Sequence, residues 1–165
     1  MNKIRKALIS VYNKKDLKPL VNALSKFKIE IISSGGTYKE IRRLGFKCID
    51  ISKFTNTPEI LNGRVKTLHP KIYGGILNKR QNKKHLREIK KNNYENIDLV
   101  IVNFYPFENT LLKKADHNKI IENIDIGGPT MVRAAAKNYN DVVVICNTGQ
   151  YQRFINELEL SLIHI

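Results

Sequence analysis

The sequence predicts an α/β domain with three layers, α/β/α, in which helices cover both faces of a mostly parallel sheet. Short apolar runs of strand length alternate along the chain with longer amphipathic stretches of helical length. The 165 residues suit one domain of ordinary size, which is large enough to bury a core. The sequence shows no internal repeat, low-complexity segment or interdomain linker, so we expect residues 1–165 to form a single domain.

The first half of the chain predicts a βαβ unit followed by a further helix and strand. The expected elements, in order, are a strand over 6–11, a helix over 16–27, a strand over 29–33, a helix over 37–44 and a strand over 46–49. Asp16 is the candidate cap of the first helix.

The second half continues this alternation. Buried strands are expected over 97–103 and 141–146, separated by helical stretches. Residues 151–160 predict an amphipathic helix with Phe154, Ile155 and Leu158 on one side, followed by an apolar tail at 162–165. We expect these apolar groups to be covered only by further chain or by a second copy. Without that cover, the chain should self-associate and lose stability.

The net charge of +14 and the pI of about 9.8 are also typical of nucleic-acid-binding proteins. The basic residues, however, are spread along the chain. The densest run, at 79–91, predicts a solvated helix face and lacks the interleaved aromatic residues that stack on bases. We therefore expect no nucleic-acid partner, although the positive potential would help to gather a phosphorylated substrate.

The sequence predicts neither a membrane-spanning segment nor a metal site. No apolar run approaches the roughly 20 residues that span a bilayer, and the basic N-terminus leads into a short strand rather than a signal-peptide core. We therefore expect a cytoplasmic protein. Cys48 and Cys146 are isolated from each other and from histidine clusters, so neither a zinc site nor a disulfide framework is expected.

Residues 127–137 predict a helix whose start can bind an anion. The Gly-Gly-Pro sequence at 127–129 allows close backbone approach and suits a first helical turn, so unpaired N–H groups would face a ligand. Asp125 lies just before this turn, and Arg133 and Lys137 share one helix face. The alternative is an ordinary Gly-Pro helix start with solvated charges.

Residues 61–75 place Arg64, Lys66, Thr67 and His69 in a segment bracketed by glycines and broken by a proline. Alternation would put the first two side chains on the same side of an extended strand, where they could hold a phosphate or polarise an oxygen. A basic surface loop is the alternative. A histidine before a proline is more often a turn residue than a catalyst.

Polar residues follow several of the predicted strands. Ser10 and Lys14 follow the first strand, residues 33–37 follow the second, and residues 103–105 follow a later one. Ligands of parallel sheets bind at the carboxyl ends of strands, so one crevice could collect these groups. The Ser-Gly-Gly-Thr sequence at a helix start can cradle a phosphate, whereas Tyr105 is by itself also consistent with a core aromatic.

Several segments, in this order, resemble the inosine-monophosphate (IMP) cyclohydrolase domain of bifunctional purine-biosynthesis proteins. They are KALISV at 6–11, SSGGT at 33–37, GRVKTLHPKIYGGIL at 63–77, VNFYPFENT at 102–110 and ENIDIGGPTMVRAAAKN at 122–138. The resemblance extends to about residue 144. It implies a methylglyoxal synthase-like fold, a purine ribonucleotide monophosphate as substrate, no cofactor or metal, and a homodimer in the full-length protein.

The reaction that the resemblance implies closes a formamido-imidazole-carboxamide ribonucleotide to IMP: the carboxamide nitrogen attacks the formyl carbon, and water leaves. The implied catalytic residues are Lys66, Tyr105, Asp125 and Lys137. The implied substrate-binding residues are Ser10, Lys14, Ser34, Gly35, Gly36, Thr37, Arg64, Thr67, Asn103, Ile126, Gly127 and Gly128. Lys66 and nearby donors would stabilise negative charge, and Asp125 would orient or deprotonate the carboxamide. Lys137 and Tyr105 would protonate the departing oxygen, with the assignment of acid and base left open.

The chain departs from the family pattern in two places. After Ser10 and Val11 the family usually has Ser-Asp-Lys, whereas this chain has Tyr12, Asn13 and Lys14, so the phosphate contact falls to the tyrosine hydroxyl or the ammonium group. The transformylase domain is not in these residues, and the cyclohydrolase domain usually continues further. We therefore expect a domain truncated at its C-terminus.

Two other functions remain open. A non-catalytic nucleotide-binding or regulatory module of the same fold would need the phosphate cradle but not the catalytic quartet. A basic nucleic-acid-binding protein would instead show strongly salt-dependent binding to duplexes or single strands.

Overall fold

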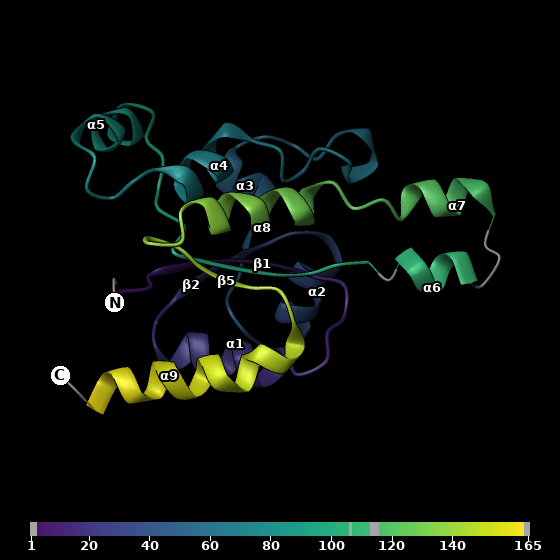
Figure 1. Cartoon of the computed structure of the whole chain (residues 1–165), viewed down its shortest axis with the longest axis horizontal. Coiled ribbons are helices and arrows are strands. Elements are labelled where there is room, and N and C mark those ends of the chain that lie inside the picture. Colours follow the sequence, from purple (N-terminus) through teal and green to yellow (C-terminus); the bar gives the residue numbers. More distant parts are fainter. Residues whose placement is uncertain (1–2, 106, 113–115, 164–165) are drawn as a thin grey trace.

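The computed structural model describes residues 3–105, 107–112 and 116–163. At its centre is a five-stranded sheet with the strand order β3-β2-β1-β4-β5, in which all neighbouring strands are parallel (Figure 1). The strands are β1 (Lys6–Val11), β2 (Glu30–Ser33), β3 (Ile49–Asp50), β4 (Leu99–Asn103) and β5 (Val143–Ile145). The predicted α/β class is confirmed, and the described sheet is wholly rather than mostly parallel.

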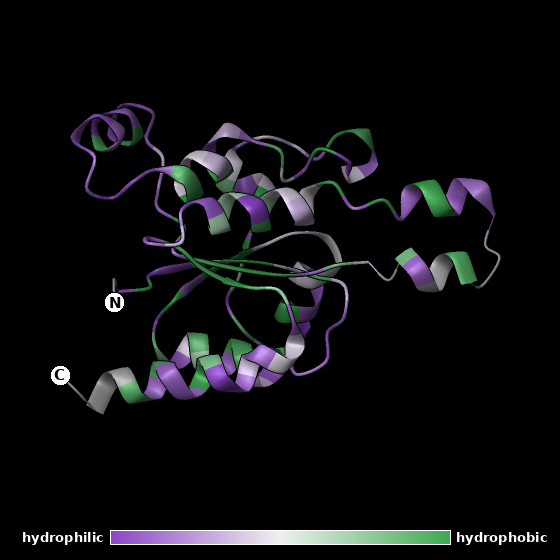
Figure 2. Ribbon diagram, viewed as in Figure 1, coloured by the Kyte–Doolittle hydropathy of each residue, from purple (hydrophilic) through white to green (hydrophobic). Residues whose placement is uncertain are grey.

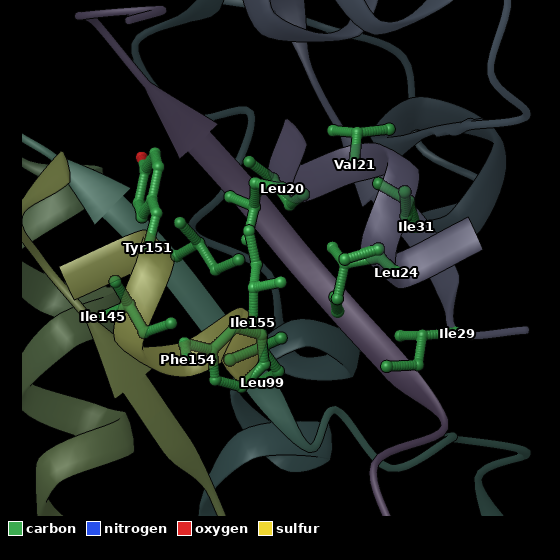
Figure 3. Close-up of a cluster of buried hydrophobic side chains, with 14 of the residues drawn as sticks. Leu20, Val21, Leu24, Ile29, Ile31, Leu99, Ile145, Tyr151, Phe154 and Ile155 are labelled. Atoms are coloured by element: carbon green, nitrogen blue, oxygen red, sulfur yellow. The ribbon is translucent and has the colours of Figure 1, made fainter. Parts of the chain in front are cut away.

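One face of the sheet is covered by α1 (Leu17–Lys26), α2 (Gly35–Arg43) and α9 (Tyr151–Ile163). Figure 3 shows the core of this layer, where Leu20 and Leu24 of α1 gather with Phe154 and Ile155 of α9 and with side chains of the strands. The heptad-like spacing of apolar residues in α1 and α9 gives each helix one apolar side, and the two helices pack against each other as well as on the sheet.

The other face is covered by α3 (Ile51–Thr55), α4 (Pro70–Leu77) and α8 (Gly127–Lys137). The apolar residues Ile72 and Ile76 of α4 and Met131 and Ala135 of α8 are fully buried there, beside Val100 of β4. Because both faces of the sheet are covered, its strands are almost continuously apolar, as their green colour in Figure 2 shows.

The remaining elements lie outside these layers. They are α5 (Lys83–Lys91), α6 (Phe107–Leu112), α7 (His117–Glu122) and the 3₁₀ turns η1 (Leu61–Gly63) and η2 (Thr148–Gln150). The basic run at 79–91 contains α5, none of whose residues is buried, which confirms the predicted solvated helix. Helices α6 and α7 contact each other and project together beyond the sheet (Figure 1).

The strand expected at 46–49 is shorter and later than predicted, because β3 covers only Ile49–Asp50. The end of α2 explains the difference. Gly45 has a φ of +87°, and the Phe46 N–H donates to the Ile41 carbonyl at 3.2 Å, which is the hydrogen bond of a Schellman helix end. Residues 45 and 46 therefore close the preceding helix instead of pairing with β2.

Two predictions about helix ends are wrong. Asp16 precedes α1 but makes no side-chain capping bond, because its backbone lies in the left-handed region with a φ of 57°. Phe154, Ile155 and Leu158 need no additional chain to cover them, since they are buried in the core beneath α1. The tail at 162–165 lies outside the residues whose side chains are described.

Candidate functional site

A cavity of about 460 Å³ opens at the carboxyl ends of β1, β2 and β4. Strand order reverses between β1 and β4, and ligands of open α/β sheets bind at such switch points. The volume is typical of small-molecule sites, which run from about 300 to 1,000 Å³. The sequence-predicted residues that line it are Ser10, Lys14, Ser34, Gly36, Thr37, Arg64, Lys66, Thr67, Asn103, Tyr105, Asp125, Ile126, Gly127 and Gly128.

Two lysine ammonium groups converge on the start of α2. A Cβ placed on Gly35 would lie 3.2 Å from Lys66 Nζ, and one placed on Gly36 would lie 3.8 Å from Lys14 Nζ. Gly35 has a φ of +52°, which a side chain would strain, so glycine is required both by the turn and by the nearby ammonium group. We call Lys14, Lys66 and residues 34–36 the α2 corner. Its free helical N–H groups and two positive charges suit a phosphate.

The Thr37 side chain does not serve this corner in the way that was predicted. Its hydroxyl is buried, accepts a hydrogen bond from the Val11 N–H at 3.1 Å and donates to the Val11 carbonyl at 2.9 Å. Similarly, the Ser33 hydroxyl donates to the Ile9 carbonyl at 2.7 Å. These hydroxyls tie β2 and the start of α2 to β1, so they position the α2 corner.

The glycines at the start of α8 make room for two neighbouring side chains. Asp125 Oδ1 accepts a hydrogen bond from the Gly128 N–H at 2.9 Å, and a Cβ on Gly128 would collide with the same carboxylate. A Cβ on Gly127 would collide with the Thr67 hydroxyl. The room at this helix start is therefore taken by side chains of the same chain, Asp125 and Thr67, and both line the wall of the cavity. The predicted close approach to a ligand stays a prediction.

The segment at 61–67 is not the extended strand that alternation predicts. Leu61 and Asn62 have positive φ angles of 52° and 53°, and the chain forms η1 and further turns up to residue 67. Arg64 lines the cavity but forms an ion pair with Glu122 of α7, with both side chains largely exposed. Arg64 and Lys66 therefore reach the cavity from a compact turn, and the arginine is already paired.

His69 is a turn residue, as the simpler interpretation predicted. It precedes α4 as its cap, and its Nδ1 accepts a hydrogen bond from the Lys71 N–H at 3.1 Å. Its Nε2 lies 3.2 Å from the Thr57 hydroxyl.

Tyr105 lies in the cavity wall beside Tyr12. Their ring centroids are 5.1 Å apart and their planes are tilted by 55°. Burial raises the pKa of Tyr105, and the charge of Asp125 and the Tyr12 ring add to the effect. The Tyr105 phenol is therefore held protonated at neutral pH, close enough to Asp125 for that charge to affect its titration.

Asn103 positions the loop after β1 instead of facing a ligand with a free amide. Its Oδ1 accepts from the Asn13 N–H and its Nδ2 donates to the Asn13 carbonyl, each at 2.8 Å. This pair of hydrogen bonds fixes the loop that carries Tyr12 and Lys14 against the end of β4.

Comparison with known proteins identifies the family to which this fold belongs. Residues 16–130 match the MGS-like domain family. The chain belongs to this family. It is 52% identical over 159 residues to the bifunctional purine biosynthesis protein PurH of Acetivibrio thermocellus, a match that covers 96% of this chain and 31% of that protein. It is 51% identical over 152 residues to PurH of Prochlorococcus marinus, covering 92% of this chain and 29% of that protein.

A solved structure shows the same fold. The crystal structure of ForH has a TM-score of 0.82 and 31% identity with this chain, and the match covers 96% of this chain and 82% of that one. The fold that the sequence resemblance implied is confirmed. The chain spans less than a third of the length of the two PurH relatives.

The MGS-like domain does not bring every predicted site residue to the cavity. Lys137 is the last residue of α8, about 15 Å from the start of that helix, and it lines an open hollow with Lys79 and Asn138 instead. Lys137 therefore does not line the cavity at the carboxyl ends of the strands. Gly35 does not line the cavity either, and contributes by leaving room for Lys66.

Some cavity residues were not predicted from the sequence. They are Val11, Asn62, Gly63, Ile121, Glu122, Ile124 and Met131. The Asn-Gly pair at 62–63 is a turn signal that could have identified one wall. Glu122 and Ile124 immediately precede the Asp125 segment, whereas nothing in the sequence of α7 indicates that it reaches the cavity.

The described residues contain no group of three or more His, Cys, Asp or Glu side chains that could hold a metal ion. Over the same ranges, no helix combines the length and apolar character needed to cross a bilayer. Cys48 is half-buried, and burial raises the pKa of its thiol to about 12, so it is an unreactive packing residue.

Proposed function

We propose that this MGS-like domain is an IMP cyclohydrolase, which closes 5-formamidoimidazole-4-carboxamide ribonucleotide to IMP with loss of water in the last step of purine biosynthesis. One observation carries the proposal: a single cavity gathers Thr67, Tyr105 and Asp125 beside the α2 corner, to which Lys66 belongs. The identity of about half with PurH proteins, whose name assigns them to purine biosynthesis, supports the same reaction.

The α2 corner would hold the ribonucleotide phosphate. The N–H groups of the first turn of α2 and the ammonium groups of Lys14 and Lys66 provide charge-assisted hydrogen bonds to its oxygens. The heterocycle would then extend across the cavity toward Asp125 and Tyr105.

The proposed reaction needs no covalent intermediate with the protein. The attacking carboxamide and the formyl group already sit on one ring, so holding them in a reactive conformer supplies much of the rate enhancement. The departing oxygen must gain two protons, one from the carboxamide nitrogen and one from the formamido nitrogen. The domain therefore has to stabilise a transient oxyanion and move protons.

The geometry suggests which residues perform these steps. Asp125 is anchored through Oδ1 at the start of α8, and we assign its second oxygen to the carboxamide proton. The Thr67 hydroxyl, packed against Gly127, and the Gly127 N–H at the start of α8 would stabilise the oxyanion. Tyr105, whose pKa is raised by burial, would donate a hydrogen bond or proton to the departing oxygen. Lys137 receives no role within its own chain.

The deciding experiment is a spectrophotometric assay of ring closure by the purified chain, in the presence of a chelator and without folate. We expect conversion of the formylated ribonucleotide to IMP, because the proposed chemistry needs neither a metal nor a second substrate. Binding of IMP without any conversion would contradict the proposal and favour a non-catalytic nucleotide-binding module. Loss of activity in the chelator that one added metal restores would contradict the metal-free mechanism.

A further inference from the structure

The aromatic pair formed by Tyr12 and Tyr105 is not explained by the chemistry above. Both rings line the cavity, yet Tyr12 keeps 51% and Tyr105 43% of its surface exposed. If the two rings served only to fill the core, other side chains would cover the faces of both rings. These rings instead pack on each other at 5.1 Å and leave apolar area open toward the ligand.

The position of Tyr12 is fixed from both sides. Its neighbour Asn13 makes two hydrogen bonds of 2.8 Å with Asn103 at the end of β4. On the other side, Lys14 Nζ donates to the Tyr12 carbonyl at 3.2 Å while lying beside the first turn of α2. The loop therefore presents an aromatic ring and a phosphate-binding ammonium group from adjacent positions, with little freedom to separate them.

This spacing matches a nucleotide. A ligand whose phosphate occupies the α2 corner has its heterocycle further along the cavity, and the flat faces of bases stack on aromatic side chains. The Tyr12 ring supplies flat apolar contact area to this wall of the cavity, which a serine at the same position would lack.

We propose that Tyr12 is a base-binding residue, and that with Tyr105 it forms an aromatic wall against which the heterocycle of a purine monophosphate packs. The inference rests on the proposed function only for the choice of ligand, and it assigns Tyr12 to the base rather than to the phosphate. The energy of one base-aromatic contact corresponds to about a tenfold change in affinity.

The test compares IMP with ribose 5-phosphate, which has the phosphate but no base, by calorimetry on four variants of the chain. Tyr12→Ser should weaken IMP binding about tenfold and leave ribose 5-phosphate binding within about twofold. Tyr12→Phe should restore most of the IMP affinity. Lys14→Ala should weaken both ligands by the same factor. Tyr139→Ser is the matched control, because Tyr139 is 74% exposed and does not line the cavity.

The chain contains no tryptophan, so its intrinsic fluorescence comes from tyrosine and offers a second readout. IMP should quench the wild-type emission more than it quenches that of Tyr12→Phe. An equal loss of both ligands in Tyr12→Ser, no loss at all, or a wild-type chain that binds neither ligand would overturn the assignment. If the wild-type chain binds IMP more tightly than ribose 5-phosphate and Tyr12→Ser removes that difference, but the chain does not convert the formylated ribonucleotide to IMP, the base-binding role stands and the proposed function fails.

Discussion

The two ends of the sheet use charged side chains in opposite ways. At the amino end, Lys6 lies between Glu30 and Glu95 at 2.5 Å from each, and its ammonium group also lies over the Phe54 ring. At the carboxyl end, Lys14 and Lys66 approach the first turn of a helix beside a cavity. Charges matched within the chain contribute to stability, whereas charges directed at a cavity are available to a ligand.

A buried pair strengthens the contrast at the amino end. Asp98 accepts the backbone N–H groups of Arg5 and Lys6 at 2.9 and 3.2 Å, and its other oxygen lies 3.6 Å from Arg80. The Arg80 guanidinium also donates to the carbonyls of Asn78 and Ile97. Burial lowers the pKa of Arg80 because removal from water disfavours the charged guanidinium, and the opposing charges of Asp98 and Asp141 offset this only in part.

The largest effect should come from Asp125 at the carboxyl end. Asp125→Asn keeps an oxygen that can accept from Gly128 but removes the proposed base, so the single-turnover rate should fall by about 10²- to 10⁴-fold. Its free energy of unfolding should stay close to the wild type. A rate within threefold of the wild type would exclude Asp125 as the base. A large loss of stability would assign it to the structure.

At the amino end of the sheet we expect a loss of stability without a loss of catalytic rate. Asp98→Ala leaves the partly buried Arg80 without the carboxylate nearest its guanidinium and removes the acceptor of two N–H groups, so stability should fall by about 2 kcal/mol. The rate per folded molecule should be unchanged, because Asp98 does not line the cavity. Urea denaturation and the ring-closure assay measure the two quantities separately.

A matched control is available on the surface. Lys26 and Glu159 form an exposed ion pair at 3.3 Å, and Glu159→Ala should change stability by less than about 1 kcal/mol. Equal losses from Asp98→Ala and Glu159→Ala would show that burial gives the amino-end pair no special importance.

The sequence alone predicted most of the fold and brought together most of the residues that line the cavity. Apolar runs of strand length identified four of the strands, and the rule for parallel sheets placed Ser10, Lys14 and Asn103 at one edge. Individual side-chain roles were less predictable. The Thr37 hydroxyl bonds to Val11, which is 26 residues away, and Asn103 bonds to Asn13 across 90 residues.

Such partners come from tertiary packing, which local patterns do not encode. The same reason explains why Lys137 does not line the cavity: a helix of eleven residues carries its two ends to different surroundings, although both belong to one sequence motif. The substrate-binding and catalytic assignments, and the homodimer of the full-length protein, stay predictions.

The smallest expected effect is a pH dependence at the amino end. Burial opposes the Lys6 charge, but the hydrogen bonds and charges of Glu30 and Glu95 outweigh it, so the pKa of Lys6 is raised. A raised lysine pKa stabilises the fold fully below the pKa of the unfolded chain, about 10.4, and the stabilisation is lost as pH rises through the folded value. Unfolding free energies measured across this alkaline range should fall more steeply for the wild type than for Lys6→Met.

The expected difference between the two curves is about 1 kcal/mol, because both glutamates remain about half exposed and water screens the pairs. Lys26→Met is the control, since that lysine is 63% exposed and pairs with Glu159 at the surface. Its curve should run parallel to the wild type. If Lys6→Met also ran parallel, the Lys6 ion pairs would contribute no more to folding than a surface pair, and the contrast between the two ends of the sheet would rest on the Arg80 and Asp98 pair alone.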